Sequence, residues 1–600
     1  YGPVMKAGWL LDNFGQVAQA PQIFRGFGIE GAFVWRGVDM PTDNVRTEFW
    51  WEAPDGSRIL GIYLLDSYRN AMVLDMTRDI AEERILSHTE TLKRFAATPN
   101  VLLMNGYEQV PQPDDVLPII EELNGKIEPA MHAVQSTPPD YLEAVRRHAP
   151  ELPILTGYQY SGRLAPVLMG VYSSRSYLNQ QNNECQRELE RWAEKFNTFA
   201  WVFGHDYPER RFERAWKTLL LNHTHDDLCG CCIDPIARDM AERFDEVSHS
   251  AQTMSSESLQ AIVQTIDTTG GESGPAGDKS ATAVVIFNPS SRPRREVAVL
   301  SLELPETIEE FHIRDGQGAV VPMQMITRIG RKADFYLWTT QAIPSLGYRT
   351  YYVVEGAGTP AQHPVVQASA AERTMENKYL RVTINTNGTL TVREKVRGDV
   401  YEDLGYFEDS GDAGDTYDYS YPAADQVVTS LDATAEITLE EAGPLAARFR
   451  VAMTLDLPSS LTDDRSGRSA ETRPVHIVSH VELAANAGHV EVRTTVNNAV
   501  KDHRLRVLFP TGLQTEQAFA GMPFDVARYP TRDKEEENDV PEALKDLMLA
   551  GRYKEPVNTR PFQNFVSLAD TASSLSVFSR GLNEFEILPE RNAIAITLLR

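Results

Sequence analysis

Residues 7–22 read AGWLLDNFGQVAQAPQ, and this stretch indicates the fold class of the N-terminal part of the chain. Two leucines precede Asp12, and Asn13, Phe14 and Gly15 follow it. An apolar run that stops at an aspartate and turns at a glycine is typical of a buried strand entering a loop. In α/β folds, catalytic groups collect at that end of the strand. The pattern leaves two interpretations of Asp12, a catalytic carboxylate or a cap of the next helix.

Outward from this stretch, strand-like and helix-like segments alternate up to residue 162. The strand-like runs are GAFVWRG, ILGIYLL and NVLLMNG, and the helix-like runs are DIAEERILSHTETLKRFAA and DDVLPIIEELN. This alternation is typical of an α/β domain whose strands are buried on both faces. The units are too few to close a barrel, as expected for part of a longer domain.

The rest of the chain changes character twice. Three amphipathic segments within residues 163–267 have apolar residues three and four apart, which predicts a three-helix bundle. The stretch TTGGESGPAGDKS predicts a linker over residues 268–281. Residues 282–600 are rich in β patterns, with a hairpin signal at NTNGTL, and predict β-sandwich domains. The predicted fold class is therefore multidomain, α/β in residues 1–162, then α, then β.

Composition excludes several classes of partner. The 600 residues include 85 acidic and 58 basic side chains, a net charge of -27, which argues against nucleic acid or an anionic membrane as partner. No run approaches the roughly 20 apolar residues of a membrane span, and the N-terminus lacks signal-peptide features. Four cysteines in 600 residues do not make a disulfide framework. We therefore expect a soluble, cytoplasmic protein.

A second carboxylate follows another apolar run. Glu108 lies in NGYEQ, where the run again meets a glycine turn and then an acid. Two carboxylates at neighbouring strand ends are the minimum for glycoside hydrolysis, in which one attacks and the other donates a proton. The alternative interpretation is an acid in a surface turn.

Two further clusters carry side chains that bind metals. His225 lies in NHTHDD, where a neighbouring carboxylate could orient its ring as in metal-bound histidines. The alternative is a polar helix end with solvated histidines. Cys229, Cys231 and Cys232 form CGCC, which suggests a thiolate zinc or iron site, but a second cysteine pair is missing. Buried structural thiols are the alternative.

Several stretches, taken in order, resemble bacterial members of glycoside hydrolase family 38, the zinc-dependent α-mannosidases. They are WLLDNFGQVAQAPQI, FVWRGVD, MNGYEQ, VYSSRSYL, NHTHDDLCGCCID, MENKYLRVTINTNGTLTV and DHRLRVLFP. The matches extend from the first residues to the last strands, so they are more specific than one short motif. The resemblance implies a partial (β/α) barrel-like catalytic domain, a three-helix bundle and C-terminal β-sandwich domains.

The resemblance also implies roles for single residues. Asp12 would be the nucleophile and a zinc ligand, and His225 a second zinc ligand. Glu108 would be the acid/base, with Asp114 and Asp115 as alternatives because many relatives have Asp at that position. The substrate-binding residues implied in the same way are Arg36, Asp226 and Tyr107.

The implied function is a retaining exo-α-mannosidase that forms a covalent glycosyl-enzyme while one Zn²⁺ holds the mannose 2- and 3-hydroxyls. Its substrate would be a mannose-containing oligosaccharide or a mannosyl small molecule, and a homo-oligomer is compatible with the family. The family has two more zinc ligands, a His and an Asp, before its W-x-x-D-x-F-G segment. We therefore expect them upstream of Tyr1, and expect this chain, as a fragment also lacking the extreme C-terminus, to bind zinc weakly and hydrolyse little. The rival functions are a carbohydrate-binding or inactive fragment and a hydrolase that uses a cysteine-bound metal.

Overall fold

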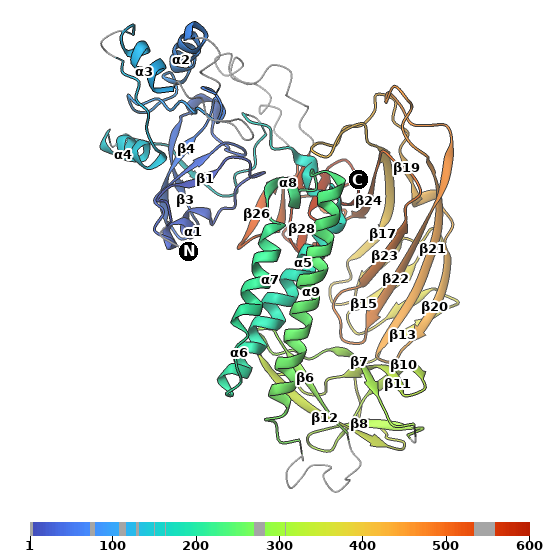
Figure 1. The fold of residues 1–600 in the computed structure, drawn as a ribbon. Coiled ribbons are helices and arrows are strands. Elements are labelled where there is room, and N and C mark those ends of the chain that lie inside the picture. The colour runs from blue at the N-terminus through green and yellow to red at the C-terminus, as the bar shows by residue number, and fades with distance from the viewer. Residues whose placement is uncertain are drawn as a thin grey trace. The chain divides into compact units, whose positions relative to one another are not determined.

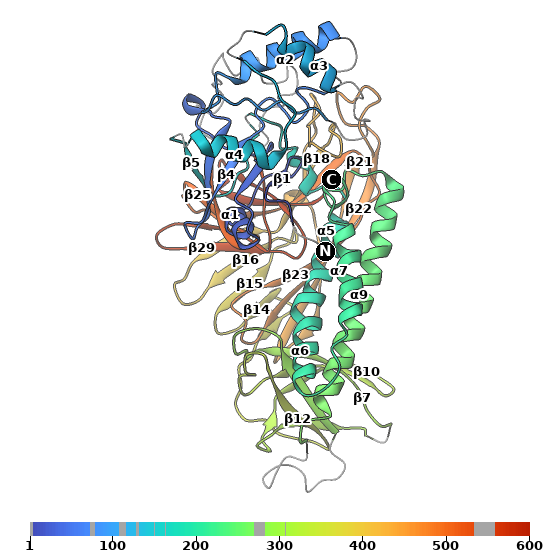
Figure 2. The same ribbon diagram turned by 60° about the vertical axis from the view of Figure 1, so that its left-hand side comes forward.

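The computed structural model describes residues 4–72, 78–106, 116–127, 131–148, 151–162, 164–268, 282–306, 308–532 and 558–600. Its contacts divide the chain into two compact units (Figure 1, Figure 2). The first comprises Tyr1–Met169 and Glu516–Gln563, and the second comprises Gly170–Thr515 and Asn564–Arg600. Each unit has hydrophobic clusters of its own.

A five-stranded sheet in the order β1-β2-β4-β3-β5 is central to the first unit. Its strands are β1 (Gly8–Leu10), β2 (Gly31–Val34), β3 (Glu48–Glu52), β4 (Arg58–Tyr63) and β5 (Ile154–Thr156). Strands β1, β2 and β4 are parallel neighbours, whereas β3 is antiparallel to β4 and parallel to β5. Over the described part of the unit, the sheet is mixed and does not close into a barrel.

Apolar side chains on both faces of this sheet explain why its strands form. In β2, Phe33 and Val34 are both 1% exposed but belong to two different hydrophobic clusters, one on each face. The predicted helices of this part are confirmed as α2 and α3. The unit also contains, in chain order, α1 (Ala20–Gly26), η1 (Thr42–Asn44), α2 (Arg78–Leu92), α3 (Val116–Asn124), α4 (Pro138–His148), β25 (Gln517–Met522), β26 (Asp525–Pro530) and β27 (Thr559–Pro561).

The strand predicted from NVLLMNG is wrong, because residues 101–106 form no ladder in the structure. The backbone of Met104 bonds instead to a loop after β4. Its carbonyl accepts from Ala71 N at 3.0 Å, and its N–H donates to Asn70 Oδ1 at 2.7 Å. The apolar side chains of this run are only partly buried against the core, and apolar spacing could not show that these backbone groups would bond to a loop.

The three amphipathic segments of the middle region are helices, as predicted, and belong to the second unit. Helix α9 contacts α5, α6 and α7, which lie side by side with it in Figure 1. Met240, Phe244, Val247, Ala251 and Met254 form its buried stripe, at intervals of three and four residues. The bounds are η2 (Met169–Tyr172), α5 (Ser176–Gln186), η3 (Arg187–Ala193), α6 (Glu194–Val202), α7 (Glu209–Leu221), α8 (His225–Leu228) and α9 (Asp234–Val263).

Antiparallel sheets make up the rest of the second unit. Within this unit their orders are β10-β11-β7, β6-β12-β8-β9, β13-β14-β15-β16-β17, β20-β21-β22-β23 and β19-β18-β24-β31-β30, and β28 pairs with β29. The bounds are β6 (Thr282–Asn288), β7 (Val297–Glu303), β8 (Phe311–Asp315), β9 (Val320–Val321), β10 (Met323–Ile329), β11 (Lys332–Trp338), β12 (Gly347–Glu355), β13 (Gln367–Ser369), β14 (Thr374–Glu376), β15 (Leu380–Ile384), β16 (Leu390–Glu394), β17 (Val400–Leu404), β18 (Tyr406–Gly411), β19 (Val428–Thr429), η6 (Ser430–Asp432), β20 (Glu436–Ala442), β21 (Ala446–Pro458), β22 (Thr472–Ala484), β23 (Glu491–Asn497), β24 (His503–Pro510), β28 (Phe565–Ala569), β29 (Ser574–Phe578), β30 (Glu584–Leu588) and β31 (Ala593–Leu599).

One apolar cluster joins several of these sheets. It contains Val382 of β15, Phe449 of β21, Ile477 of β22 and Leu505 of β24. The hairpin predicted at NTNGTL is confirmed, because β15 pairs with β16 around the turn at Gly388, whose φ is 85°. Most of the predicted linker, residues 269–281, lies outside the described residues. Among those described, no helix has the length and apolar character needed to cross a membrane.

Candidate active site

Asp12 and Arg36 meet at one edge of the mixed sheet. Strands β1 and β2 are parallel, and their last residues, Leu10 and Val34, are paired in register. Asp12 and Arg36 each lie two residues beyond that pair. Arg36 donates to Asp12 Oδ1 from Nε at 3.3 Å and from Nη2 at 3.2 Å. The Asp12 side chain is 22% exposed and that of Arg36 is 11% exposed, so the carboxylate is fixed and still reachable.

The guanidinium of Arg36 is also held by groups other than Asp12. Its Nη1 donates to the carbonyl of Pro166 at 2.6 Å, and its central carbon lies 4.2 Å from the ring centre of Trp35. Burial lowers the pKa of Arg36, while the negative charge of Asp12 acts in the opposite direction. Because a guanidinium stays protonated in proteins, Asp12 has a permanent cation beside it.

The two loops that carry this ion pair are fixed by a third segment. Gln159 exchanges backbone hydrogen bonds with Gln16, at 2.9 and 3.0 Å. Gly15 and Gly37 have φ values of 108° and 89°, which favour glycine. A Cβ on Gly37 would lie 2.7 Å from the Gln159 carbonyl oxygen and 3.0 Å from the Gly15 Cα. The close approach of the loops therefore requires glycine and holds the ion pair in place.

A second acid, Asp66, which was not among the predicted site residues, lies at the same edge of the sheet. Strand β4 ends at Tyr63, which is paired with Val34, and Asp66 follows three residues later. Asp66 Oδ2 contacts Nδ1 of His88 from α2. The apolar run ILGIYLL stops at Asp66 as WLL stops at Asp12, so the same pattern could have identified this residue.

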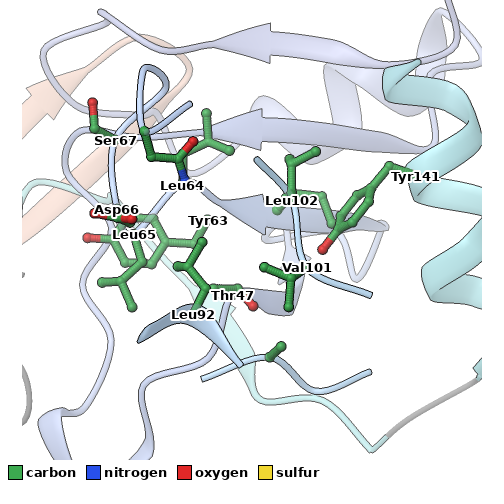
Figure 3. Close-up of a pocket in the computed structure, with 13 residues that line it drawn as sticks. Thr47, Tyr63, Leu64, Leu65, Asp66, Ser67, Leu92, Val101, Leu102 and Tyr141 are labelled. Carbon is green, nitrogen blue, oxygen red and sulfur yellow. The ribbon is translucent and has the colours of Figure 1, made fainter. Parts of the chain in front are cut away.

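A small cavity lies beside the end of β4, lined by Thr47, Tyr63, Asp66 and Tyr141 among others (Figure 3). The volume open to water-sized molecules is about 20 Å³. A ligand pocket typically measures about 300 Å³ or more, whereas one water needs roughly 10–15 Å³ by this measure. The cavity can therefore hold water but not a sugar.

In the second unit, the sequence NHTHDD contains a buried half and an exposed half. Asn222 donates to the Met240 carbonyl at 3.0 Å, and His223 contacts an asparagine of α5 at 2.7 Å. Burial lowers the pKa of His223. His225 and Asp226 begin α8, and their side chains are 49% and 57% exposed, with His225 Nε2 3.7 Å from Asp226 Oδ2. The first half thus anchors the helix end, and the second half presents polar groups to solvent.

The cysteines that follow α8 form a compact group with Asp226. Cys231 Sγ lies 2.9 Å from Cys229 Sγ and 3.2 Å from Asp226 Oδ1. Within the described ranges, this is the one group of three metal-binding side chains close enough to surround an ion. Cys232 lies apart, with its Sγ 4.0 Å from Met240 Sδ.

The structure brings some of the predicted site residues together. Asp12 contacts Arg36 in the first unit, and His225 lies beside Asp226 in the second. The predicted residues Tyr107 and Glu108, and the alternatives Asp114 and Asp115, lie outside the described residues. Their roles stay predictions.

The donor types of Asp12 and His225 suit zinc, which binds carboxylate oxygen and imidazole nitrogen. A catalytic zinc usually has three protein ligands, so these two side chains alone would not complete such a site.

Three family models match the chain in succession. The glycosyl hydrolases family 38 N-terminal domain matches residues 1–166, the alpha mannosidase middle domain matches residues 167–262, and the family 38 C-terminal domain matches residues 375–600. A solved structure of an alpha-mannosidase from Enterococcus faecalis V583 superposes with a TM-score of 0.87 and 29% identity, covering 100% of this chain and 71% of that one.

Curated relatives agree with these matches. A putative mannosylglycerate hydrolase from Halalkalibacterium halodurans is 27% identical, over 99% of this chain and 70% of the relative. Human alpha-mannosidase 2C1 is 23% identical, over 65% of this chain and 33% of the relative. With three successive models of one family matched, the chain belongs to glycosyl hydrolase family 38, the α-mannosidase family, and is a glycoside hydrolase.

Proposed function

We propose that the protein hydrolyses terminal α-linked mannose with retention of configuration, and that Asp12 is its nucleophile. The observation that carries this proposal is the Asp12–Arg36 pair at the ends of two parallel strands. Asp12 is partly exposed, and the loop around it is fixed, as a nucleophile requires. Family membership supports the reaction class.

In the proposed first step, Asp12 bonds to the anomeric carbon while the glycosidic bond breaks. Glu108, assigned by the family resemblance, donates a proton to the leaving oxygen. Glu108 then removes a proton from water, which attacks the anomeric carbon and releases the Asp12 carboxylate. Two displacements give net retention, and the carboxyl groups of such enzymes lie about 5–5.5 Å apart.

Arg36 prepares Asp12 for this step. Both of its hydrogen bonds to the carboxylate go to Oδ1, which fixes the rotation of the carboxyl group. The adjacent positive charge also favours the ionised nucleophile. We assign Arg36 as a positioning residue for Asp12.

Asp12 and His225 would hold the zinc ion that the family resemblance implies, together with at least one further ligand. When bound, zinc would supply Lewis-acid chemistry at the hydroxyl groups of the mannose. Asp226, beside His225, is the residue of α8 that we propose to contact the sugar.

For the substrate we propose a mannosyl small molecule or a mannose-containing oligosaccharide. The Halalkalibacterium halodurans relative, which aligns with 99% of this chain, is named for mannosylglycerate. The human relative, named as an α-mannosidase, aligns with 65%. Comparing kcat/KM for mannosylglycerate and for α-linked mannobioses decides between the two classes.

The test is to follow hydrolysis of an aryl α-mannoside by the full-length, zinc-loaded protein with proton NMR. Retention predicts that α-mannose appears first and then mutarotates. Activity should fall when a chelator removes zinc and return when zinc is restored. If β-mannose forms first, the nucleophile assignment is wrong. If the zinc-loaded protein binds mannose without cleaving the glycoside, the binding-module function replaces the hydrolase.

A further inference from the structure

Cys229 and Cys231 lie in the turn between α8 and α9, and their sulfur atoms are 2.9 Å apart. Two thiolates on one tetrahedral zinc would lie about 3.8 Å apart, given Zn–S bonds of about 2.3 Å. A disulfide bond measures about 2.05 Å. The sulfurs therefore lie less than 1 Å from the separation in a disulfide bond, and a zinc ion bound by both would require them to move apart by about 0.9 Å.

The turn at Gly230 brings the two side chains together. Two residues of extended chain span up to roughly 7 Å, slightly more than the 4.4–6.8 Å that Cα atoms of a disulfide usually allow. Gly230 bends the backbone with a φ of 75°, and a Cβ at this position would lie 2.4 Å from the Ser174 carbonyl oxygen. Backbone hydrogen bonds from Gly230 to Asp227 and from Cys232 to Asp226, both 2.9 Å, hold the turn.

The Cys231 thiol also connects this turn to the polar end of α8. Its sulfur lies 3.2 Å from Oδ1 and 3.4 Å from the carbonyl oxygen of Asp226. Asp226 is the neighbour of His225. A disulfide sulfur carries no proton, so oxidation would end the donation from Cys231 to Asp226.

The other two cysteines provide contrast. Cys185 is 1% exposed and donates to the Phe244 carbonyl at 3.2 Å. The pKa does not distinguish it from the pair, because burial raises the pKa of Cys185 and the hydrogen bond with Cys229 raises that of Cys231. Cys232 faces the sulfur of Met240. Neither residue has a sulfur within bonding reach of a cysteine partner in the described chain, so the paired thiols are Cys229 and Cys231.

We propose that Cys229 and Cys231 form a reversible redox site. A small disulfide, such as oxidised glutathione, oxidises the two thiols to an intramolecular disulfide, and this disulfide lowers the rate of glycoside hydrolysis. One protein thiolate attacks the reagent, forms a mixed disulfide and releases one small thiol. The second cysteine, after losing its proton, displaces the second small thiol. Two cysteine thiols and one disulfide thus become one protein disulfide and two small thiols. The small ring strains the bond, which makes such disulfides easy to reduce.

The link to hydrolysis rests on the proposed function, because it acts through Asp226 and His225. The chemistry of the thiols does not depend on that function. The two parts therefore need separate measurements on the same protein.

The first measurement treats the full-length protein with oxidised glutathione, alkylates the remaining thiols and maps the peptides by mass spectrometry. We expect Cys229 and Cys231 to form one linked peptide, lighter by two hydrogens, while Cys232 is alkylated. Dithiothreitol should restore both thiols. If both are alkylated after oxidation, or oxidise only after a chelator is added, the redox site is overturned, in the second case in favour of a bound metal.

The second measurement follows aryl α-mannosidase activity of the same samples. Oxidation should reduce activity several-fold in the wild type and in Cys232→Ser, the neighbouring control. Cys229→Ser and Cys231→Ser should resist this loss. If the mapped disulfide forms and activity stays constant, the link to hydrolysis is overturned. If the reduced protein has no activity, the proposed function fails, and the peptide map still decides whether the thiols form a redox site.

Discussion

Two buried glutamates, one in each unit, have opposite ionisation tendencies. Glu48 of β3 is fully buried and accepts hydrogen bonds from Ala97 N at 2.8 Å and from the Tyr141 hydroxyl at 2.9 Å. Burial raises the pKa of Glu48. Burial acts in the same direction on Glu408 of β18, but the charges of Arg506 and Arg591 outweigh it and lower the pKa of Glu408. At Glu48 burial outweighs the hydrogen bonds that favour the carboxylate and raises the pKa, whereas at Glu408 the guanidinium charges outweigh burial and lower it.

The same contrast separates the two sheets. In the second unit, β18 and β24 carry paired charges inside the protein, such as Asp409, which contacts both Arg468 and His503. In the first unit, the Asp12–Arg36 ion pair lies beyond the strand ends, where the carboxylate is partly exposed. A fully buried ion pair is best explained by structure, whereas a fixed and reachable pair at a strand end is suited to chemistry.

The largest expected effect comes from replacing the strand-end acid. Asp12→Asn should reduce kcat/KM for an aryl α-mannoside by at least about 10³-fold, because an amide is a poor nucleophile. Its melting temperature should match that of Asp55→Asn, an exposed turn residue of the same unit used as control. If Asp12→Asn melts at a lower temperature than the control but keeps its activity, Asp12 has a structural role and is not the nucleophile.

The buried acid of the other sheet should behave in the reverse way. Asp409→Asn leaves Arg468 and His503 without their carboxylate and should lower the free energy of unfolding by about 3–5 kcal/mol. Urea denaturation monitored by circular dichroism measures this. The control is Glu471→Gln, whose exposed contact with Arg473 at 3.4 Å should contribute about 0–1 kcal/mol. Equal losses in both variants would contradict a special role for burial.

Arg36→Lys sharpens the role of the strand-end cation. Lysine keeps the charge but cannot reproduce the fixed two-nitrogen contact, so we expect kcat to fall roughly 10–100-fold, or about 1.4–2.7 kcal/mol. The matched control is Arg58→Lys in the exposed contact with Glu52, which should leave kcat unchanged. An unchanged kcat in Arg36→Lys would show that charge alone is sufficient at this position.

The smallest expected effect is on the pH dependence of stability when Glu48 or Glu408 is replaced by glutamine. The raised pKa of Glu48 gives a stabilisation that is complete below the usual value of 4.5 and is lost as the pH rises through the folded-state pKa. Stability of Glu48→Gln should therefore improve relative to wild type as the pH rises above 4.5. The lowered pKa of Glu408 has the opposite sign, so the penalty of Glu408→Gln should shrink as the pH falls below 4.5. Urea unfolding midpoints of each variant and of the wild type, measured from below to above pH 4.5, give the stability difference as a function of pH. If this difference changes in the same direction with pH for Glu48→Gln and Glu408→Gln, the two pKa values are not shifted in opposite directions.

Sequence patterns predicted much of this molecule because they are local. Apolar runs predicted β2 and β4, and helical spacing predicted α2, α3 and the helices of the middle region. The strand expected at residues 101–106 failed because the hydrogen bonds of Met104 go to a loop distant in sequence. The paired charges of β24 were missed because alternating arginines in HRLRV are also typical of a strand with one solvated face.

By itself, the sequence determined the periodicities, the turns and the family, since each depends on the order of neighbouring residues. It also placed Asp12 and Arg36 after apolar runs. Only the tertiary structure decided that these runs are adjacent parallel strands in register, which joins two residues 24 positions apart in an ion pair. Tertiary structure likewise decided that the pKa of Glu48 is raised and that of Glu408 is lowered, because the pKa of a buried acid depends on partners that its own neighbours in the chain do not specify.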